Sequence, residues 1–597
     1  MLEMQKSSTF SNPFTVMSPE KLDASTAQQL FVEVFSDFPQ VRNPGHSMIL
    51  GARGSGKSMI FRCLLPDVLK LKEGRSFEDL EFLAFHVPIK NTQLKITDLE
   101  RLDCHHAAFL INEHFFTLSV IIEVLQALTK SLSSNLVFDE NRYREFLEKT
   151  YSRRLKLSGC KSECRFDDAS AESFFQSLYD HALDMHADFI RYVLEFCPEI
   201  DSPAPAYNLP LLSFTGFLVP FFQGLIALPG FPKKCVYLFI DDADNLSKTQ
   251  TKILNSWLST RTHPEISLKV SAQLGNYKSF VSPNGTLVES PHDYQEINIS
   301  DRYTTSKTAY HRRVKEIVQK RLDLAGISGV LPEDYFPSYK KQEEAVEKER
   351  LRLLSAWEEE GTGYRASDDA LRYARPNYIR SLGGTRKARS TYMYAGFEHL
   401  VHLSSGVIRY FLDSAAAMFD ETIKEAGESA AIASIPCGIQ NKVARDQGDR
   451  MMFSQFQKLE TDEEVLTGKL GIVQNLQNLI NAMGFTFHDI LVSDRSERRV
   501  FSIALTNVPT KEIMDVLSFG VQTGYLHMAT IGNKDGTGRT WLFILNRCLA
   551  PQFTLDPTGF AGYLFVTNER LMGAMSDGKR LRDVESQEEP EQLTLFN

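Results

Sequence analysis

The chain has 597 residues, of which 43% are hydrophobic and 24% are charged, values close to the averages for globular proteins. This length is enough for about three or four domains of ordinary size. The formal net charge is −10, which excludes binding to nucleic acid through bulk positive charge, so any such contact must come from local basic surfaces.

The amino-terminal third begins a pattern of strands and helices in alternation. Residues 48–50 and 82–89 are apolar runs typical of buried strands, and a helix is expected after Ser58. From about residue 98 to residue 205 the periodicity is helical, which indicates an insertion. Strands that alternate with helices predict an α/β fold with a parallel sheet.

The strongest motif follows the first strand. Residues 51–58 read GARGSGKS and fit the phosphate-binding pattern G-x-x-x-x-G-K-[ST] without deviation. Such a loop surrounds phosphate oxygens with backbone N–H groups at the start of a helix. Lys57 is expected to reach the β- and γ-phosphates, and the Ser58 hydroxyl is expected to bind Mg²⁺. We therefore predict ATP and Mg²⁺ as ligands, and the loop residues predicted to contact them are Gly51, Arg53, Gly54, Ser55, Gly56, Lys57 and Ser58.

Residues 208–232 carry no charge and are long enough to span a membrane. Pro220 and Gln223 interrupt this segment, however, and a predicted strand follows it at once. We therefore expect a buried helix there and no membrane span.

A second phosphate-site element follows. The run at residues 235–240 is typical of a central parallel strand. It ends at Asp241, expected to hold Mg²⁺, and Asp242, expected to orient or deprotonate the attacking water.

The later elements complete a base, a lid and a carboxyl-terminal domain. We expect a helix at 249–259 and strands at 266–274 and 294–299 in a base of residues 1–305. Helices at 310–325 and 402–419, with a charged helical arm at 339–360, form a lid of residues 306–435. A helix that ends at Gly484, a second helix at 509–520 and a Gly-rich hairpin predict a winged-helix-like domain, residues 436–580. The acidic tail, residues 581–597, is expected to be disordered.

The two phosphate motifs, their separation and the helical region after them resemble AAA+ ATPases of the initiator type, above all origin-recognition-complex ATPases and their bacterial relatives. The resemblance implies a RecA-like parallel-sheet base, a helical lid and a winged-helix (α+β) domain. It implies further nucleotide contacts from Pro13 and Phe14 around the adenine, from Ser271 as a γ-phosphate sensor and from Arg409 as the lid sensor. Asp242 stands where the family usually has Glu, so slow hydrolysis is expected. Arg261 and Arg302 are alternatives for an arginine that acts across a subunit interface.

Two basic regions are candidate DNA surfaces. Residues 371–394 contain Arg386, Lys387 and Arg389 among tyrosines, which suits backbone contact and base stacking. The predicted hairpin carries Lys534 and Arg539. The alternatives are a solvated loop that pairs with acidic neighbours and a winged domain that contacts only protein.

The tail ends in QLTLF, residues 592–596, which resembles the bacterial sliding-clamp-binding motif. Its predicted clamp contacts are Gln592, Leu593, Leu595 and Phe596. The alternative is a tail that docks on its own protein.

The resemblance as a whole implies a cytoplasmic ATP-binding and ATP-hydrolysing switch that acts on DNA as a homo-oligomer or with an effector partner. The clamp-like tail points to a bacterium or its mobile elements, where analogy suggests phage defence or mobile-element control. The alternative is a nucleotide-gated oligomeric signalling scaffold that activates a separate effector without DNA-stimulated hydrolysis. The eight cysteines form no C-x-x-C pair, which indicates reduced thiols in such a compartment.

Overall fold

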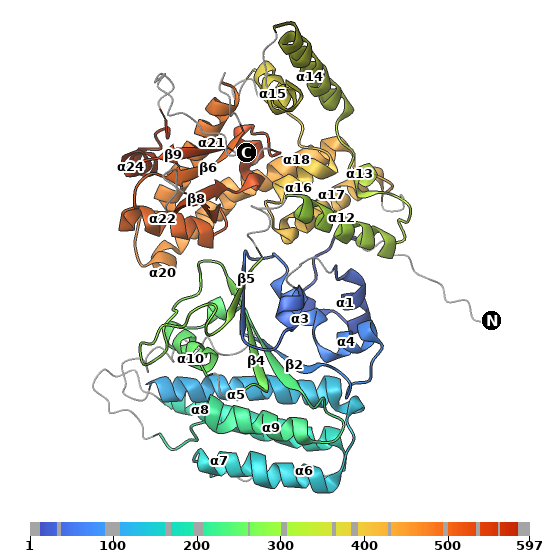
Figure 1. Ribbon diagram of the computed structural model, residues 1–597, viewed down its shortest axis with the longest axis vertical. Helices are drawn as coiled ribbons and strands as arrows, with labels where there is room; N and C mark the ends of the chain where they lie inside the picture. The colour runs from blue at the N-terminus through green and yellow to red at the C-terminus, as the bar shows by residue number, and fades with distance from the viewer. Residues whose placement is uncertain are drawn as a thin grey trace, which may run out of the picture. The chain divides into compact units, whose positions relative to one another are not determined.

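The chain divides into two compact units (Figure 1), one of residues 17–300 and one of residues 1–16 with 301–597. The computed structural model describes residues 12–32, 38–89, 108–161, 169–195, 207–260, 263–299, 307–360, 366–383, 392–427, 432–493, 499–532, 538–558 and 562–582. Each unit has its own hydrophobic core, and each is described by itself.

The unit of residues 17–300 is built on a five-stranded sheet. The strand order is β2-β3-β4-β1-β5, and all four neighbouring pairs are parallel. The strands are β1 (Ser47–Gly51), β2 (Phe82–Pro88), β3 (Cys235–Asp241), β4 (Ile266–Gln273) and β5 (Gln295–Asn298). The predicted α/β fold with a parallel sheet is confirmed. Because the strands are parallel, the carboxyl ends of β1, β3 and β4 meet at one edge of the sheet.

Short helices flank this sheet. They are η1 (Pro19–Lys21), α1 (Ala24–Leu30), α2 (Phe38–Arg42), α3 (Lys57–Cys63), α4 (Pro66–Glu73), η8 (Ala243–Asn245) and α10 (Lys248–Leu258). The rings of Phe61 in α3 and Phe239 in β3 stack at a centroid distance of 4.7 Å. This contact fixes α3, and with it the loop before it, against the centre of the sheet.

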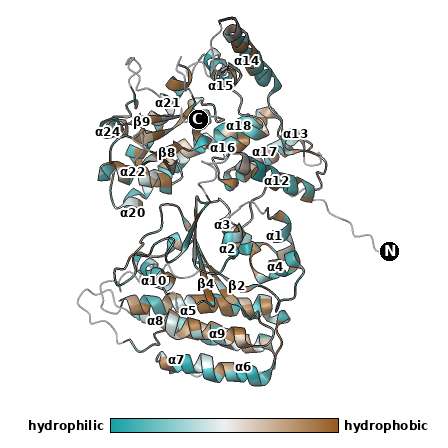
Figure 2. Ribbon diagram, viewed as in Figure 1, coloured by the Kyte–Doolittle hydropathy of each residue, from teal (hydrophilic) through white to brown (hydrophobic). Residues whose placement is uncertain are grey.

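A helical insertion lies between β2 and β3. It contains α5 (Ala108–Ala127), α6 (Glu140–Phe146), α7 (Arg153–Leu157), α8 (Ala171–Glu195) and α9 (Val219–Ala227), with π-helical turns η4 (Leu128–Leu132), η6 (Leu147–Ser152) and η7 (Phe214–Leu218). Figure 2 shows much of α5 and α9 in hydrophobic colours. Among the described residues one helix, Ala108–Asn135, is long and apolar enough to cross a membrane, but 72% of its apolar window is buried inside the protein. The segment at 208–232 contains the buried helix that the sequence predicts.

The second unit begins with the lid helices. They are α12 (Lys307–Leu324), α13 (Pro332–Tyr335), α14 (Lys340–Glu360), α15 (Ala366–Ser381), α16 (Phe397–Leu403), α17 (Ile408–Ala426) and α18 (Cys437–Asp449). Figure 1 shows α14 and α15 side by side as a helical hairpin, and α14 is the charged helix predicted at residues 339–360. The predicted single helix at 402–419 is wrong. Ser405 and Gly406 have φ angles of 53° and 80°, and this left-handed turn separates α16 from α17.

The carboxyl-terminal region joins helices to a mixed sheet of order β7-β8-β6-β9. Its elements are η10 (Arg450–Gln455), α19 (Phe456–Thr461), α20 (Glu463–Thr467), α21 (Ile472–Leu491), β6 (Val500–Leu505), α22 (Lys511–Gln522), β7 (Leu526–Gly532), β8 (Arg539–Leu545), α23 (Ala550–Phe553), β9 (Gly562–Val566) and α24 (Asn568–Asp577). The antiparallel hairpin β7–β8 follows two helices, as predicted. A single helix, α22, connects β6 to β7.

The predicted end of α21 at Gly484 is wrong, because the helix continues for almost two more turns. A Cβ atom at this position would lie 2.3 Å from Cδ2 of Phe553. Gly484 therefore serves close packing of α23 against α21 and does not terminate the helix. The same hydrophobic core contains lid residues such as Phe336 and carboxyl-terminal residues such as Phe553, so the lid and the carboxyl-terminal region form one packed body.

Candidate nucleotide-binding site

The loop between β1 and α3 has the backbone that a phosphate-binding loop needs. Gly54 and Gly56 have φ angles of 84° and 105°, conformations that residues with a Cβ rarely adopt. A Cβ on Gly51 would lie 2.4 Å from Cγ1 of Ile299. Three glycines of the motif therefore have a steric reason, and the strand–loop–helix context predicted from the sequence is present.

The polar groups of the loop fit a bound triphosphate. The Lys57 side chain is buried, and its Nζ donates to the carbonyl oxygens of Gly51 (2.9 Å) and Ala52 (3.1 Å). The buried Ser55 hydroxyl has no hydrogen-bond partner. Phosphate oxygens would accept from both groups. Arg53 is exposed beside the loop.

Electrostatics at Lys57 also favour an anionic ligand. Burial lowers the pKa of its ammonium group, and the carboxylates of Asp242, Asp244 and Asp241 raise it in part. Within the part of the chain that the structure describes, Lys57 forms no ion pair. A buried ammonium group without a paired anion is stabilised when a phosphate supplies the negative charge.

Asp241 lies at the end of β3 and is almost completely buried. Its carboxylate accepts hydrogen bonds from Ser271 Oγ and from Ser58, and it lies 3.2 Å from His86 Nε2. Burial raises the pKa of Asp241, but these hydrogen bonds and the His86 imidazole outweigh burial and lower the pKa below its ordinary value. The structure thus brings together the two predicted magnesium ligands, Ser58 in the first turn of α3 and Asp241 at the end of β3.

Asp242 follows in a left-handed conformation, with φ at 57° and ψ at 43°. Its N–H donates to Ser271 Oγ (2.9 Å) and to Asp241 Oδ1 (3.1 Å). The side chain is half-buried at the same edge of the sheet, where a water-orienting carboxylate is expected.

Ser271 lies within β4 and not at its end. Its hydroxyl proton is donated to Asp241, while its oxygen accepts from the N–H of Asp242. Since a hydroxyl has one proton to donate, Ser271 as placed positions the two aspartates and has no proton for a γ-phosphate. This geometry disagrees with its predicted sensor role.

Two residues of this edge, Gln273 and His86, were missed by sequence reasoning. Gln273 ends β4 directly opposite Gly51, and its N–H donates to Asp244 Oδ1 at 3.0 Å. His86 contacts Asp241 from β2. The sequence signals were a polar residue at the end of a predicted strand and a histidine within an apolar run, and neither is specific without the sheet order.

Phe14 was predicted to contact adenine, but its ring has no exposed surface. It packs on Tyr335 and Phe336 at centroid distances of 5.9 and 5.5 Å, inside the lid unit. Arg321 donates to the carbonyl oxygens of Pro13 (2.9 Å) and Thr15 (3.1 Å). As placed, Phe14 anchors the chain to the lid, and an adenine stack on its ring is excluded by this burial. A contact from Pro13 stays a prediction.

Arg409 lies in the first turn of α17, as predicted for the lid sensor. Burial raises the pKa of Asp413, and the charge of Arg409 lowers it in part.

Several other predicted residues lie outside the described residues. They are Arg261, Arg302, Arg386, Lys387, Arg389, Lys534, Gln592, Leu593, Leu595 and Phe596.

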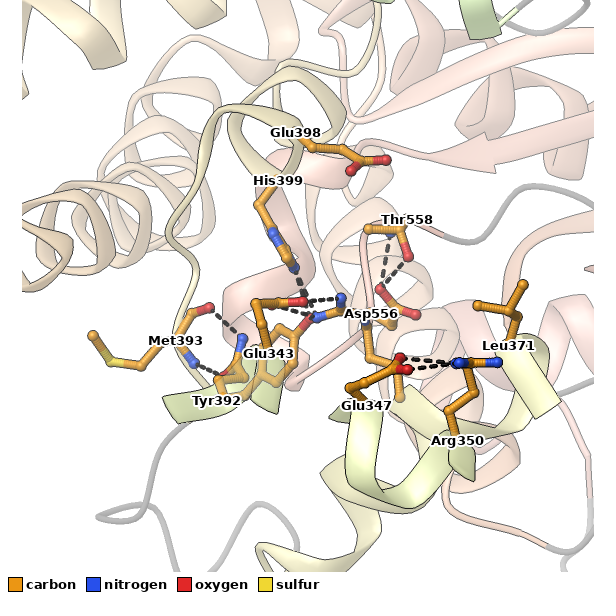
Figure 3. Close-up of polar contacts among 12 residues, drawn as sticks. Glu343, Glu347, Arg350, Leu371, Tyr392, Met393, Glu398, His399, Asp556 and Thr558 are labelled. Carbon is orange, nitrogen blue, oxygen red and sulfur yellow. Dashed lines mark hydrogen bonds and ion pairs between the residues drawn. The ribbon is translucent and has the colours of Figure 1, made fainter. Parts of the chain in front are cut away.

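Part of the basic and aromatic segment at 371–394 is not a surface. Tyr392 and Tyr394 are fully buried, and Arg375 donates to Glu343 (2.8 Å) and Tyr392 (3.1 Å). Figure 3 shows Glu343, Tyr392 and His399 facing one another beside Asp556. These side chains join the lid to the carboxyl-terminal region, so they are unavailable for stacking on nucleic acid.

The hairpin β7–β8 does present a basic and aromatic face. Arg539 is exposed, and its Nε donates to Thr530 Oγ1 at 2.7 Å. Trp541, the cross-strand partner of Thr530, is 40% exposed. Side chains at 539 and 541 lie on one face of the strand, so a cation and a large aromatic ring are adjacent.

The chain is similar to a known protein family and to solved structures. A family model described as ORC-CDC6-like matches residues 12–565. The solved structure of Cdc6p from Pyrobaculum aerophilum is 12% identical, with a TM-score of 0.27, and the match covers 91% of this chain and 97% of that chain. The ORC2 protein of Aeropyrum pernix, in ADPNP-ADP complexes, is 10% identical with a TM-score of 0.26, covering 93% and 92%. A search of curated proteins gave no match.

Proposed function

The chain belongs to the ORC-CDC6-like family, and from this membership we propose that it is an ATP-binding and ATP-hydrolysing AAA+ switch that acts on DNA. The observation that carries the proposal is the meeting of Lys57, Ser58 and Asp241 at one edge of a parallel sheet, with the Ser55 hydroxyl unpartnered in the loop. Bound Mg²⁺–ATP would supply the phosphoanhydride bond and the charge that this edge is built to neutralise.

Each residue has a role that follows from its position. The loop N–H groups, Ser55 and Lys57 bind the phosphates, and Ser58 and Asp241 hold Mg²⁺. Asp242 orients or deprotonates the attacking water, and its side chain is one methylene shorter than Glu, which suits slow turnover. We assign the γ-phosphate sensor to Gln273 and the lid sensor to Arg409.

Nucleotide binding and phosphate release test the proposal. Lys57→Ala should abolish ATP binding, whereas Asp242→Asn should keep binding and lose hydrolysis, because the amide cannot accept the proton of water. Gln273→Ala should keep most of the affinity and lower the hydrolysis rate. Equal loss of affinity in the Lys57 and Asp242 variants would show that Asp242 belongs to the binding site and not to the hydrolytic step.

Contact with DNA is proposed through the hairpin. The exposed Arg539 and Trp541 support it, because a cation contacts phosphate and an aromatic ring stacks on a base or sugar. Lys534→Glu with Arg539→Glu should weaken duplex binding and reduce the salt dependence by the contribution of about two phosphate contacts. Lys511→Glu, an exposed charge change on α22, is the control and should leave the salt slope largely unchanged.

An unchanged salt slope, with an ATPase rate that DNA does not stimulate, would favour the second candidate. In that case the protein is a nucleotide-gated oligomeric scaffold that activates a separate effector. The mass of the purified protein would then increase when ATP is added, without any need for DNA.

The tail adds a further proposed partner, the bacterial sliding clamp, and with it a role in phage defence or mobile-element control. A free peptide of the last dozen residues should bind purified clamp at micromolar strength, about −8 kcal/mol. Leu595→Ala with Phe596→Ala should remove binding, since buried apolar anchors dominate small interfaces. No binding by the peptide, or loss of ATPase activity on tail deletion, would favour docking of the tail on its own protein.

A further inference from the structure

The segment before α1 places a carboxylate at the nucleotide edge of the sheet. Glu20 lies in η1, and the next residues are fixed to the base by the Arg62 guanidinium, whose Nε and Nη2 donate to Leu22 O at 3.1 and 2.9 Å. Leu22, Ala27 and Val68 form a small buried cluster beneath this segment. The backbone at Glu20 is therefore held in place by buried contacts, although its side chain is exposed.

Glu20 meets two residues from the centre of the sheet. One carboxylate oxygen of Glu20, one imidazole nitrogen of His86 and one carboxylate oxygen of Asp241 all lie within 4.8 Å of one another. His86 Nε2 is 3.2 Å from Asp241 Oδ2, while Oδ1 of Asp241 accepts from Ser271 and from the N–H of Asp242. The Oδ2 oxygen thus faces the imidazole, and Oδ1 is held by Ser271 of β4 and by the backbone of Asp242.

The chemistry of the three donors differs from that of a magnesium site. Mg²⁺ takes oxygen ligands and keeps several waters. One imidazole nitrogen with two carboxylates on one side, and with open positions on the other, is a donor set for Co²⁺, Fe²⁺, Zn²⁺ and related ions. Metal–ligand distances near about 2.1 Å require the donors to approach one another, and the exposed Glu20 side chain can provide that movement.

A second carboxyl group, that of Glu123, lies close enough to His86 for the charge of the imidazole to act on it. Burial raises the pKa of Glu123 on α5, and the nearby His86 imidazole lowers it in part. Histidines that bind metal usually place their other nitrogen against a carboxylate or carbonyl, which orients the ring. Glu123 is a carboxyl group near His86 that could orient the imidazole in this way.

We propose that Glu20, His86 and Asp241 bind a divalent transition-metal ion in the nucleotide-free chain. The proposal rests on the proposed function only in sharing Asp241, and the site itself requires no nucleotide. The metal would occupy the Oδ2 side of the aspartate that is assigned to Mg²⁺. Through Glu20, the segment before α1 would contribute a metal ligand, although it belongs to neither phosphate motif.

The test is Co²⁺ binding to the tag-free, nucleotide-free full chain, followed by calorimetry and by visible absorption in the presence of excess Mg²⁺. Wild-type protein should bind one Co²⁺ with d–d bands and without a sulfur-to-cobalt charge-transfer band. Glu20→Gln and His86→Gln should each weaken binding on the order of 100-fold, because each removes a ligand. The amide of His86→Gln can still donate to Asp241, so the fold of the strand ends is kept. Glu78→Gln, an exposed acid of the same unit, should bind as the wild type does.

Three results would overturn the proposal. Displacement of Co²⁺ by Mg²⁺ would indicate an ordinary hard-cation site, a sulfur-to-cobalt band would place the metal on cysteines, and unchanged binding in the Glu20 and His86 variants would place it elsewhere. Mg²⁺–ATP binding is measured on the same samples. Wild-type protein that binds Mg²⁺–ATP but no Co²⁺ contradicts only the metal site, and wild-type protein that binds Co²⁺ but no Mg²⁺–ATP contradicts only the proposed function.

Discussion

The nucleotide edge of the sheet and the interior of the lid unit both bury charged side chains, but they neutralise them differently. In the lid unit, Arg375 Nη2 lies 2.8 Å from Glu343 Oε2, and Arg499 Nε lies 3.5 Å from Oδ2 of the buried Asp556. Asp556 also accepts a hydrogen bond from Thr558 (Figure 3). At the nucleotide edge, the hydrogen bonds of the Lys57 ammonium group to described residues go to loop carbonyls alone. The lid unit neutralises its buried charges with its own side chains, whereas the nucleotide edge leaves the charge of Lys57 for a ligand to neutralise.

The pKa shifts express the same difference. Burial alone would lower the pKa of Arg375, but Tyr392, Asp556 and Glu343 outweigh burial and raise it. For Lys57 burial dominates, and the pKa is lowered although three carboxylates act on it. A buried cation that its own protein leaves under-neutralised marks a binding site, whereas a fully paired one marks a structural joint.

The largest effect is expected from Lys57→Met. Nucleotide affinity should fall by at least about 100-fold, because a charge-assisted contact with phosphate is lost. The free energy of unfolding should stay the same or rise slightly, since the variant no longer buries an unpaired charge. ATP titration and urea unfolding measure the two quantities. A strong loss of stability would mean that Lys57 holds the loop together and is not reserved for a ligand.

The same substitution in the lid should do the opposite. Arg375→Met leaves Glu343 without its partner and removes a countercharge near Asp556, at a cost of about 3–5 kcal/mol in the stability of the second unit. Hydrogen exchange resolved by unit measures the loss, and residues 17–300 should keep their protection. Arg352→Met, which removes an exposed ion pair with Glu349 from the same helical hairpin, is the control, expected within about 1 kcal/mol of wild type.

Packing offers a smaller contrast within the lid unit. Gly484→Ala should destabilise this unit by about 1–3 kcal/mol, because its Cβ meets the Phe553 ring. Gly573→Ala in α24 is the matched control, where the nearest atom to an added Cβ is Lys579 Cδ at 3.7 Å. That variant should gain about 0.5–1 kcal/mol as a helical alanine. Thermal unfolding of the pair distinguishes close packing from helix termination, and a neutral Gly484 variant would contradict the packing argument.

A second buried lysine gives the smallest effect. Lys269 donates to the carbonyls of Asn43 and Gly45 at 2.6 and 2.8 Å, and burial lowers its pKa to about 7. The unfolded chain binds this proton up to the ordinary lysine pKa, so the stability of the first unit should rise with pH above 7. The wild-type gain between pH 7 and 8 should exceed that of Lys269→Met by about 1 kcal/mol. Unfolding at both pH values tests this, with the exposed Lys234→Met as a control; equal slopes in all three proteins would contradict the shift.

The sequence predicts those parts of the site that are contiguous. Residues 51–58 and the strand that ends at Asp241 each carry their own pattern, and the structure brings them together. His86 and Gln273 lie in β2 and β4, which the strand order places on either side of β3, and Glu20 meets Asp241 from η1. Their roles were therefore not visible in the spacing of residues.

Burial also decides between interpretations that composition leaves open. The family resemblance implies ligand contact for Phe14, and Tyr392 belongs to a segment whose composition suits base stacking, yet both side chains are fully buried. Gly484 follows a helical pattern in the place where a helix often ends, but the close approach of Phe553 gives it another reason. These roles depend on contacts between residues far apart in the sequence, and a local sequence pattern does not contain that information.

The order of the chain gives the two units two covalent connections. The chain passes from one unit to the other after residue 16 and returns after residue 300. A proteolytic cut at residue 300 would leave residues 12–16 as the remaining link, and these are held in the unit of residues 301–597 by the buried Phe14 ring and by Asn12, whose amide donates to Ala416 O at 2.9 Å. Each unit has its own hydrophobic core, so the nicked protein should keep both units folded.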